Sequence, residues 1–185
     1  MPIDDGAPVA RREPVTEHGI VQAVWAEALA VVTSAQRAND PCLALFQAMD
    51  AGLRKTPGHR LLTVLVYFGD HGESQRAYSS RPDEYPLNGR KTLEQAPRMR
   101  QVLASGIPFI GHTRQAIVDN YPDHARLLAI GCGSVVNLPV HWGTEVVGTV
   151  NLLHAEGHYG EADLPRIEAW AQLALPAFLA VLRRQ

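Results

Sequence analysis

The segment from Ser134 to Leu153 constrains the fold of this chain more than any other. It holds two runs of β-forming residues, Ser134 to Val140 and Val147 to Leu153, with a short turn between them. Two such runs predict an antiparallel hairpin. Pro139 has no backbone N–H, so it belongs at a sheet edge or a bulge. Gly148 allows a neighbouring group to approach the backbone closely.

The rest of the chain predicts helices and strands in the order ααββ, loop, αβαββα. Apolar residues recur at helical spacing in several segments, whereas the run 61–68 is β-branched and aromatic and predicts a buried strand. A long polar connection over 80–97 follows the second strand, and loops of this length are usually functional or mobile. The expected helices cover about 17–37, 41–55, 97–105, 114–129 with a break at 121–123, and 163–183 with a kink at Pro176.

Length and composition favour one globular domain. The chain has 185 residues, of which 46% are hydrophobic and 19% charged, and its formal net charge is −2. We therefore expect a flexible arm over 1–16, a single domain over 17–185 and no nucleic-acid partner. No apolar run reaches the roughly 20 residues of a membrane span. Cys42 and Cys132 make no disulfide framework, so we expect a cytoplasmic protein with reduced thiols.

The hairpin motif resembles that of the GAF domains, a family of small sensor modules. The serine at 134, the β run, the Pro139-Val140 pair, the turn and the Val147-Gly148 pair match its pattern. The segment Tyr159-Gly160-Glu161-Ala162-Asp163-Leu164 resembles the family's entry into its last helix. This resemblance implies an α+β, profilin/PAS-like fold with a central antiparallel sheet. Terminal helices would cover one face, and the loop with the short helices would cover the other.

The resemblance also implies a ligand site between the sheet and the second layer. Strand alternation then assigns the residues to faces. Asn137, Thr149 and Asn151 would point into the pocket, and Ser134, Val136, Leu138 and Val140 toward the terminal helices. Asparagine is depleted from strands, and buried amides need partners. Those partners are either a ligand or backbone groups of the covering loop.

Five further side chains are candidate ligand contacts. Tyr78 on the second strand and Arg81, Tyr85 and Arg90 on the loop would contact an anionic ligand if the loop folds over the sheet. The alternative is a solvated basic loop. The segment Pro122-Asp123-His124 resembles one in tetrapyrrole-binding GAF domains, which makes His124 a pocket candidate or, alternatively, a helix-capping histidine. A bilin itself is not expected, because no attachment cysteine is apparent.

The leading hypothesis is a sensory or regulatory domain that binds an unidentified small molecule. Its signal would pass through a partner protein or through a homodimer of the terminal helices, with Trp25, Trp170 and Phe178 on their apolar stripes. No catalytic residue, metal site or cofactor is assigned, since the eight histidines are scattered. Two alternatives stay open. One is a thiol-dependent enzyme of the free methionine-R-sulfoxide reductase type using Cys132, and the other is a ligand-free structural or dimerisation module.

Overall fold

A six-stranded antiparallel sheet forms the centre of the protein. The computed structural model describes residues 17–87, 90–94 and 96–184, so the arm expected over 1–16 lies outside the described residues. The strand order is β3-β2-β1-β6-β5-β4. The strands are β1 (Leu61–Phe68), β2 (Glu73–Ser79), β3 (Lys91–Thr92), β4 (Phe109–Gly111), β5 (Ser134–Trp142) and β6 (Glu145–His154).

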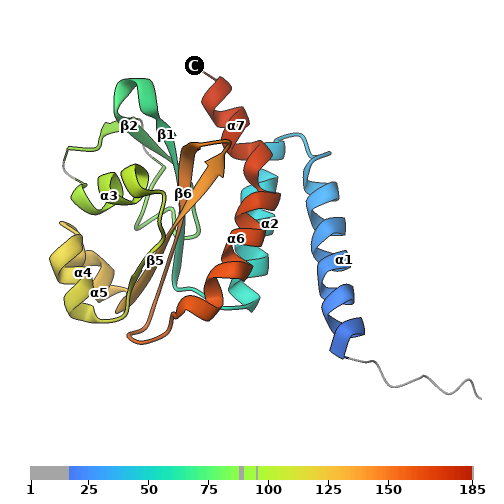
Figure 1. The fold of residues 1–185 in the computed structure, drawn as a ribbon, viewed down its shortest axis with the longest axis horizontal. Helices are drawn as coiled ribbons and strands as arrows, with labels where there is room; N and C mark the ends of the chain where they lie inside the picture. Colours follow the sequence, from blue (N-terminus) through green and yellow to red (C-terminus); the bar gives the residue numbers. More distant parts are fainter. Residues whose placement is uncertain (1–16, 88–89, 95, 185) are drawn as a thin grey trace, which may run out of the picture.

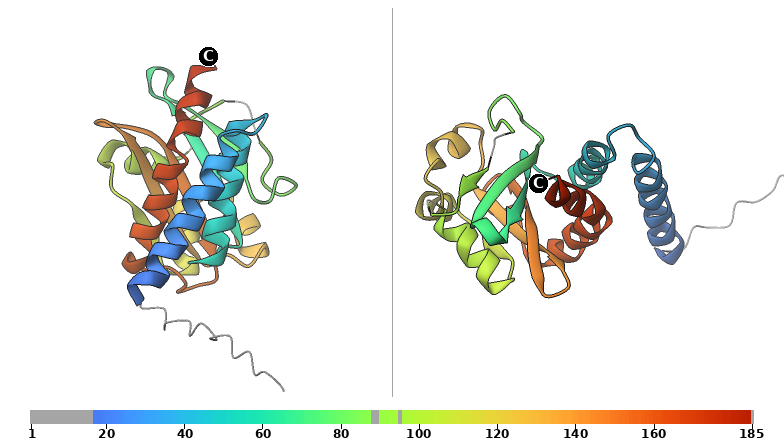
Figure 2. Two further views of the ribbon diagram at one scale, coloured as in Figure 1. Left: turned by 90° about the vertical axis from the view of Figure 1, so that its right-hand side faces the viewer. Right: turned by 90° about the horizontal axis from the view of Figure 1, so that it is seen from above.

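Helices cover both faces of this sheet, as Figures 1 and 2 show. One face carries α2 (Pro41–Lys55), α6 (Leu164–Leu173) and α7 (Leu175–Arg183), and α1 (Glu17–Ala35) packs outside α2. The other face carries α3 (Pro97–Ser105), α4 (Arg114–Asn120) and α5 (His124–Ala129). Short 3-10 turns occupy Gly69–His71 and Glu161–Asp163. The expected α+β architecture is confirmed.

Local sequence signals set the helix ends. Asp40 accepts a hydrogen bond from the backbone N–H of Leu43 at 3.1 Å, and Pro41 occupies the first turn of α2. The expected break between α4 and α5 falls at residues 121–123. The C-terminal helix is interrupted at Ala174 and resumes with Pro176 in the first turn of α7, because proline fits a helix start and not a helix interior.

The face toward the terminal helices is solidly packed. Val136, Leu138 and Val140 of β5 join the large core cluster there, as strand alternation predicts. Gly148 of β6 lies close to both the neighbouring strand and α7. A Cβ at this position would lie 2.3 Å from the backbone oxygen of Leu65 and 2.7 Å from the ring of Phe178. The missing side chain therefore allows α7 to pack directly on the sheet.

An irregularity in β2 changes which side chains face which layer. Val64 of β1 pairs with Tyr78, but the next residue, Leu65, pairs with Arg76, so Ala77 is left over as a bulge. A bulge carries one extra residue and redirects the side chains on either side of it. Tyr78 consequently faces the terminal helices, and Arg76 faces the opposite layer together with Leu65.

Candidate functional site

A cavity of about 200 Å³ lies between the sheet and the layer formed by α3, α4, α5 and the loop that follows β2. Its floor comes from β1, β5 and β6, and most of its walls are apolar. The lining residues are Leu61, Thr63, Leu65, Arg76, Tyr85, Ala96, Arg98, Met99, Asn120, Tyr121, Pro122, Asp123, Leu127, Asn137, Asn151 and Leu153.

A chain of polar side chains crosses the floor of this cavity. The Tyr121 hydroxyl donates to Oδ1 of Asn137 at 2.5 Å, and Nδ2 of Asn137 donates to Oδ1 of Asn151 at 2.8 Å. Nδ2 of Asn151 then reaches the hydroxyl of Thr63 at 3.3 Å. Asn137 and Asn151 are directly paired across β5 and β6, and both are buried. The two amides thus bond mainly to each other, to Tyr121 of the covering layer and to β1.

Arg76 extends into the cavity from the bulged part of β2. Its Nη1 donates to the backbone oxygen of Pro86 at 2.9 Å, and its Nε is buried without a hydrogen-bond partner in the described part of the chain. Its guanidinium carbon lies 5.4 Å from the centre of the Tyr85 ring. Burial lowers the pKa of Arg76, and the carboxylate of Asp123 partly offsets that effect.

Arg98 supplies a second guanidinium from the first turn of α3. It stacks at 4.0 Å over the ring of Phe109. It donates to Oε1 of Gln101 at 2.7 Å and from Nε to Oδ1 of Asn120 at 2.8 Å. All of these partners are neutral. Among the described residues, the charge of Arg98 is therefore held in place by neutral groups and has no acidic partner within 4.0 Å.

Three of the eight predicted contact residues line the cavity. They are Tyr85, Asn137 and Asn151. Thr149 shares their sheet face, since it pairs with Leu65 of β1, but it does not line the cavity. The hydroxyl of Thr149 is buried without a hydrogen-bond partner among the described residues.

Tyr78 requires a correction, because it lies on the opposite face of the sheet. Its hydroxyl donates to Oδ2 of Asp50 at 2.6 Å, and its ring packs near Phe46 of α2. The bulge at Ala77 is the reason. Regular alternation would place Arg76 and Tyr78 on the same face, because they are two residues apart, whereas the bulge between them turns Arg76 toward the cavity and Tyr78 toward the terminal helices.

Arg81, Arg90 and His124 also lie outside the cavity lining. Arg81 is ion-paired with Glu84. Arg90 stacks at 3.8 Å over the ring of Phe68, beside a separate hollow near α2 and α7. Nδ1 of His124 lies 2.9 Å from the backbone oxygen of Tyr121, in a local contact at the start of α5. The cavity instead contains Arg76 and Arg98, which no sequence pattern had singled out.

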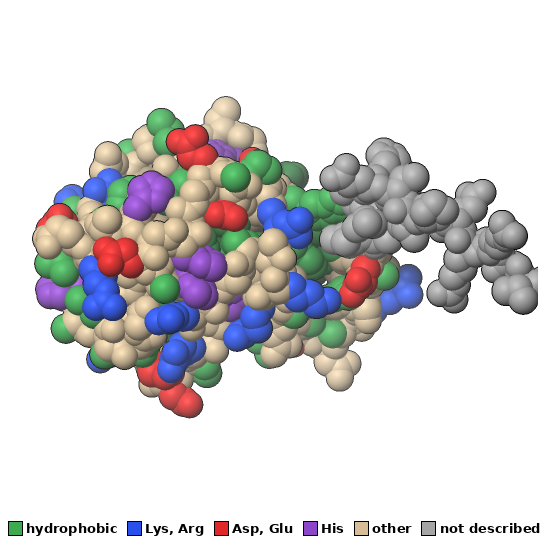
Figure 3. Space-filling view, turned by 90° about the horizontal axis from the view of Figure 1, so that it is seen from below, with side chains coloured by type: hydrophobic (Ala, Val, Ile, Leu, Met, Phe, Trp, Pro, Cys, Tyr) green, Lys and Arg blue, Asp and Glu red, His purple; other side chains and the backbone are tan. Residues whose placement is uncertain are grey.

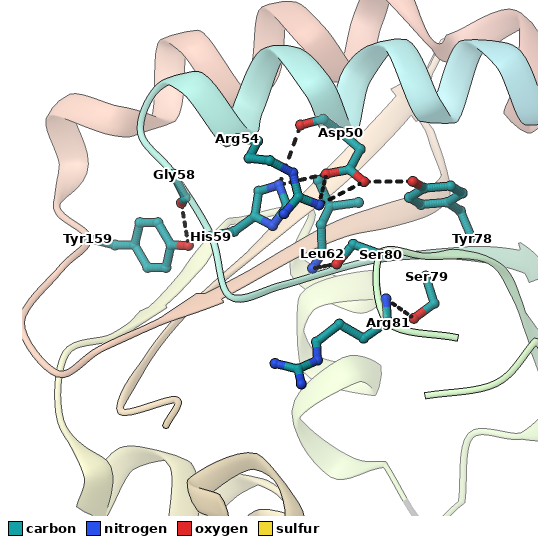
Figure 4. Close-up of polar contacts among 10 residues, drawn as sticks. All are labelled: Asp50, Arg54, Gly58, His59, Leu62, Tyr78, Ser79, Ser80, Arg81 and Tyr159. Atoms are coloured by element: carbon teal, nitrogen blue, oxygen red, sulfur yellow. Dashed lines mark hydrogen bonds and ion pairs between the residues drawn. The ribbon is translucent and has the colours of Figure 1, made fainter. Parts of the chain in front are cut away.

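A second buried polar cluster lies between the sheet and the terminal helices, and Figure 4 shows it. Asp50 of α2 is at its centre. Its Oδ1 lies 2.8 Å from Nε2 of His59 and 3.1 Å from Nη2 of Arg54, and its Oδ2 accepts from Tyr78. Burial alone would raise the pKa of Asp50, but the hydrogen bonds from His59 and Tyr78 and the nearby positive charges together lower it. Asp50 therefore links α2 to β2.

The two thiols lie on opposite faces of the sheet. Cys42 is in the cluster under the terminal helices, and Cys132 is in the smaller cluster beside the cavity; both are free and buried. Burial raises the pKa of Cys132 to about 11, although Arg60 and Arg81 act in the opposite direction. The reactive thiolate form is thus scarce near neutral pH. Within the described residues, no three acidic, histidine or cysteine side chains are placed to hold a metal ion.

Known proteins resemble this chain in structure but not in sequence. No protein-family model matches the sequence, and no curated protein matches it. Among solved structures, the GAF domain of a phosphoenolpyruvate-protein phosphotransferase from Coxiella burnetii superposes with a TM-score of 0.64 at 14% identity, over 88% of this chain and 96% of the other. The fold is that of a GAF domain.

Two further GAF-fold structures are relevant to the site. The phycoerythrobilin-bound GAF domain of a cyanobacterial phytochrome has a TM-score of 0.62 at 16% identity, over 89% of this chain and 100% of the other. The free methionine-R-sulfoxide reductase of Neisseria meningitidis, in complex with its substrate, has a TM-score of 0.59 at 15% identity, over 94% and 96%. At these identities the GAF fold is shared, and the residues of the site are not transferable.

Basic, acidic and histidine side chains are interspersed on the face that Figure 3 shows, in keeping with the formal net charge of −2. Among the described residues, no helix combines the length and the apolar character that crossing a membrane would need.

Proposed function

We propose that this chain is a GAF-type regulatory domain that binds a small molecule in the cavity beneath α3, α4 and α5. One observation carries the proposal. An apolar cavity contains a few convergent polar groups, including the buried Nε of Arg76, which has no hydrogen-bond partner among the described residues. Pockets of this composition are typical of ligand sites. Unpartnered buried polar groups are rare in proteins and call for an explanation such as a ligand.

The size of the cavity limits the ligand. Its volume of about 200 Å³ is below the roughly 300–1,000 Å³ of pockets that hold drug-sized ligands. A small metabolite fits this space, whereas a tetrapyrrole is far too large for it. The cavity volume supports the expectation that no bilin is bound.

The signal would leave the domain through the terminal helices, in a cytoplasmic homodimer or a complex with a partner protein. Trp170 and Phe178 are buried against the sheet of their own chain, so they offer no contact to another subunit. The outer helix α1 is different, because Leu29 is 53% exposed and Val31 is 41% exposed. The dimer proposal therefore depends on α1.

Native mass spectrometry of freshly purified protein, followed by thermal-shift measurements with a metabolite panel, tests the ligand proposal. We expect a retained or stabilising small molecule. Asn137→Ala and Asn151→Ala should each weaken that binding, since both side chains line the cavity. Asn39→Ala, an exposed residue outside the cavity, is the matched control and should leave binding unchanged. Undiminished binding in both cavity variants would refute the proposed site.

The two alternatives have separate tests. The reductase alternative is favoured by the structural likeness to the Neisseria enzyme and by Cys132 beside the cavity, but the raised thiol pKa and the remote Cys42 oppose it. Methionine sulfoxide reduction that disappears in Cys132→Ser would establish it. The ligand-free structural module would be favoured by a clean apo mass with no thermal shift.

A further inference from the structure

We propose that the cavity selects a small organic monoanion, a carboxylate with an apolar body, and that Arg76 binds its carboxylate group. This inference rests on the proposed function of the cavity as a ligand site and specifies the chemical class of the ligand. It follows from the position of Arg76, from the charges around the cavity and from the apolar walls.

The guanidinium of Arg76 is held in position by one hydrogen bond, and part of its donor capacity is free among the described residues. Its Nη1 donates to the backbone oxygen of Pro86 at 2.9 Å, while its Nε is buried and finds no hydrogen-bond partner in the part of the chain that the structure describes. Nε and Nη2 form the edge of a guanidinium that matches the two oxygens of a carboxylate. In the described part of the chain, no carboxylate oxygen lies within 4.0 Å of Arg76. The available edge is therefore suited to an anion from outside the chain.

The charges that line the cavity leave one positive charge in excess. Arg76 and Arg98 are the cations, and Asp123 at the exposed rim is the one acidic lining residue among those described. Within the described residues, the side-chain partners of Arg98 are neutral amide oxygens, and Asp123 forms no ion pair with Arg76 within 4.0 Å. A ligand with a single negative charge would balance this set.

The other residues that line the cavity indicate the character of the rest of the ligand. Leu61, Leu65, Met99, Leu127 and Leu153 surround the space with apolar surface. The polar chain of Tyr121, Asn137 and Asn151 offers hydrogen-bonding groups on the floor. A phosphoryl group carries more negative charge than the single excess positive charge of the lining would balance. A nucleotide is larger than the cavity volume of about 200 Å³. A compact carboxylic acid with an apolar body meets all of these conditions.

Isothermal titration calorimetry on the full chain with matched pairs tests this inference. The pairs are benzoate and benzamide, 4-hydroxybenzoate and 4-hydroxybenzamide, and 3-methylbutanoate and 3-methylbutanamide, with phenyl phosphate as the phosphoryl probe. We expect at least one carboxylate to bind about tenfold or more tightly than its amide, because hydrogen bonds to charged groups are the stronger ones. Arg76→Gln should abolish that preference.

Control variants keep the test decisive. Arg126→Gln removes an exposed guanidinium that also lies near the Tyr85 ring, at 5.8 Å, but does not line the cavity, so it should preserve the preference. Arg76→Lys keeps the charge but removes the planar fork, so it should reduce the preference even if Arg76→Gln does not fold. Thermal unfolding of each variant monitors folding.

The outcomes separate this inference from the proposed function. Equal binding of acid and amide, a preference that survives in the Arg76 variants, or tighter binding of phenyl phosphate would overturn the inference and leave the ligand site standing. The same holds if no carboxylate binds while native mass spectrometry shows a retained neutral molecule. If the wild-type protein retains nothing and binds no compound of either panel, both proposals fail.

Discussion

The two faces of the central sheet use their polar groups in opposite ways. Toward the terminal helices, Asp50 takes contacts from His59, Tyr78 and Arg54, and apolar side chains fill the space around them. Toward the short helices, Asn137 and Asn151 bond to each other, to Tyr121 and to Thr63, but a cavity remains beside them. There the Nε of Arg76 has no hydrogen-bond partner among the described residues. The polar groups of the first face stabilise the fold, whereas the second face keeps space and a hydrogen-bond donor that a ligand could occupy.

The contrast shows that a buried polar group indicates a ligand site when one of its donors or acceptors has no partner in the protein, and not merely because it is buried. An amide pair inside a sheet looks unusual in a sequence, yet here its groups find partners in the protein itself. The unusual group is an arginine, because a partly buried cation without an acid partner is costly to maintain. Substitutions on the two faces should therefore differ in both size and kind of effect.

The largest expected effect is at Gly148, where the packed face leaves no room for a side chain. Gly148→Ala would place a Cβ 2.3 Å from a backbone oxygen of β1 and 2.7 Å from the ring of Phe178. Neither the strand nor the helix can yield easily, so we expect the free energy of unfolding to fall by about 3 kcal/mol or more. Urea denaturation measures this change.

Gly69→Ala is the matched control, because nothing lies within 4 Å of a Cβ at that position and its φ is not in the left-handed region. It should change the stability by less than about 0.5 kcal/mol. If Gly148→Ala were as mild as this control, the packed face would be looser than the contacts indicate.

The next effect concerns the charge at the centre of the packed face. Asp50→Asn removes a carboxylate that His59, Tyr78 and Arg54 contact, and we expect a loss of about 2–3 kcal/mol at pH 7. The folded protein holds the pKa of Asp50 below its ordinary value. The stabilisation is thus complete above the unfolded-state pKa of about 3.9 and is lost as the pH falls through the folded-state pKa.

Chemical denaturation of both proteins from pH 7 to pH 3 follows this dependence. The stability difference between wild type and Asp50→Asn should be constant near neutrality and should shrink below about pH 4. Asp83→Asn, at an exposed position in the loop, should show no comparable difference. A difference that stays constant down to pH 3 would contradict the role of the Asp50 carboxylate.

The smallest expected effect is the difference between truncating two adjacent residues of β1. Val66 faces the packed layer and is fully buried, whereas Leu65 lines the cavity. Val66→Ala should cost about 2 kcal/mol, because it opens a void in a dense core. Leu65→Ala removes more atoms but only enlarges an existing cavity, so we expect about 1 kcal/mol. Thermal or urea unfolding would compare them, and a larger loss for Leu65→Ala would show that the cavity face is equally close-packed.

Much of the fold was predictable from the sequence, because its signals are local. The hairpin of β5 and β6, the cap at Asp40 and the break at residues 121–123 each depend on neighbouring residues. Strand alternation also placed Asn137 and Asn151 correctly on the face that bears the cavity. These predictions hold because pleating and capping depend little on distant contacts.

The rest of the site depends on three-dimensional contacts that the sequence pattern does not display. The extra residue at Ala77 is invisible in the sequence of β2, where regular alternation would keep Arg76 and Tyr78 on one face, so the departure of Tyr78 from the cavity face could not be predicted. No sequence pattern marked Arg76 as a cavity residue. Arg98 reaches the cavity only through the position of α3. Arg81 and His124 form local contacts that compete with any ligand.

The bulge at Ala77 also affects how related chains can be compared. One additional residue in β2 transfers every side chain before it to the opposite face, while the hairpin around it keeps its pairing. Gaining or losing one residue there would be a short evolutionary route to a different cavity lining on an unchanged scaffold. An alignment that ignores this insertion would assign the arginine of one homologue to the hydrophobic core of another.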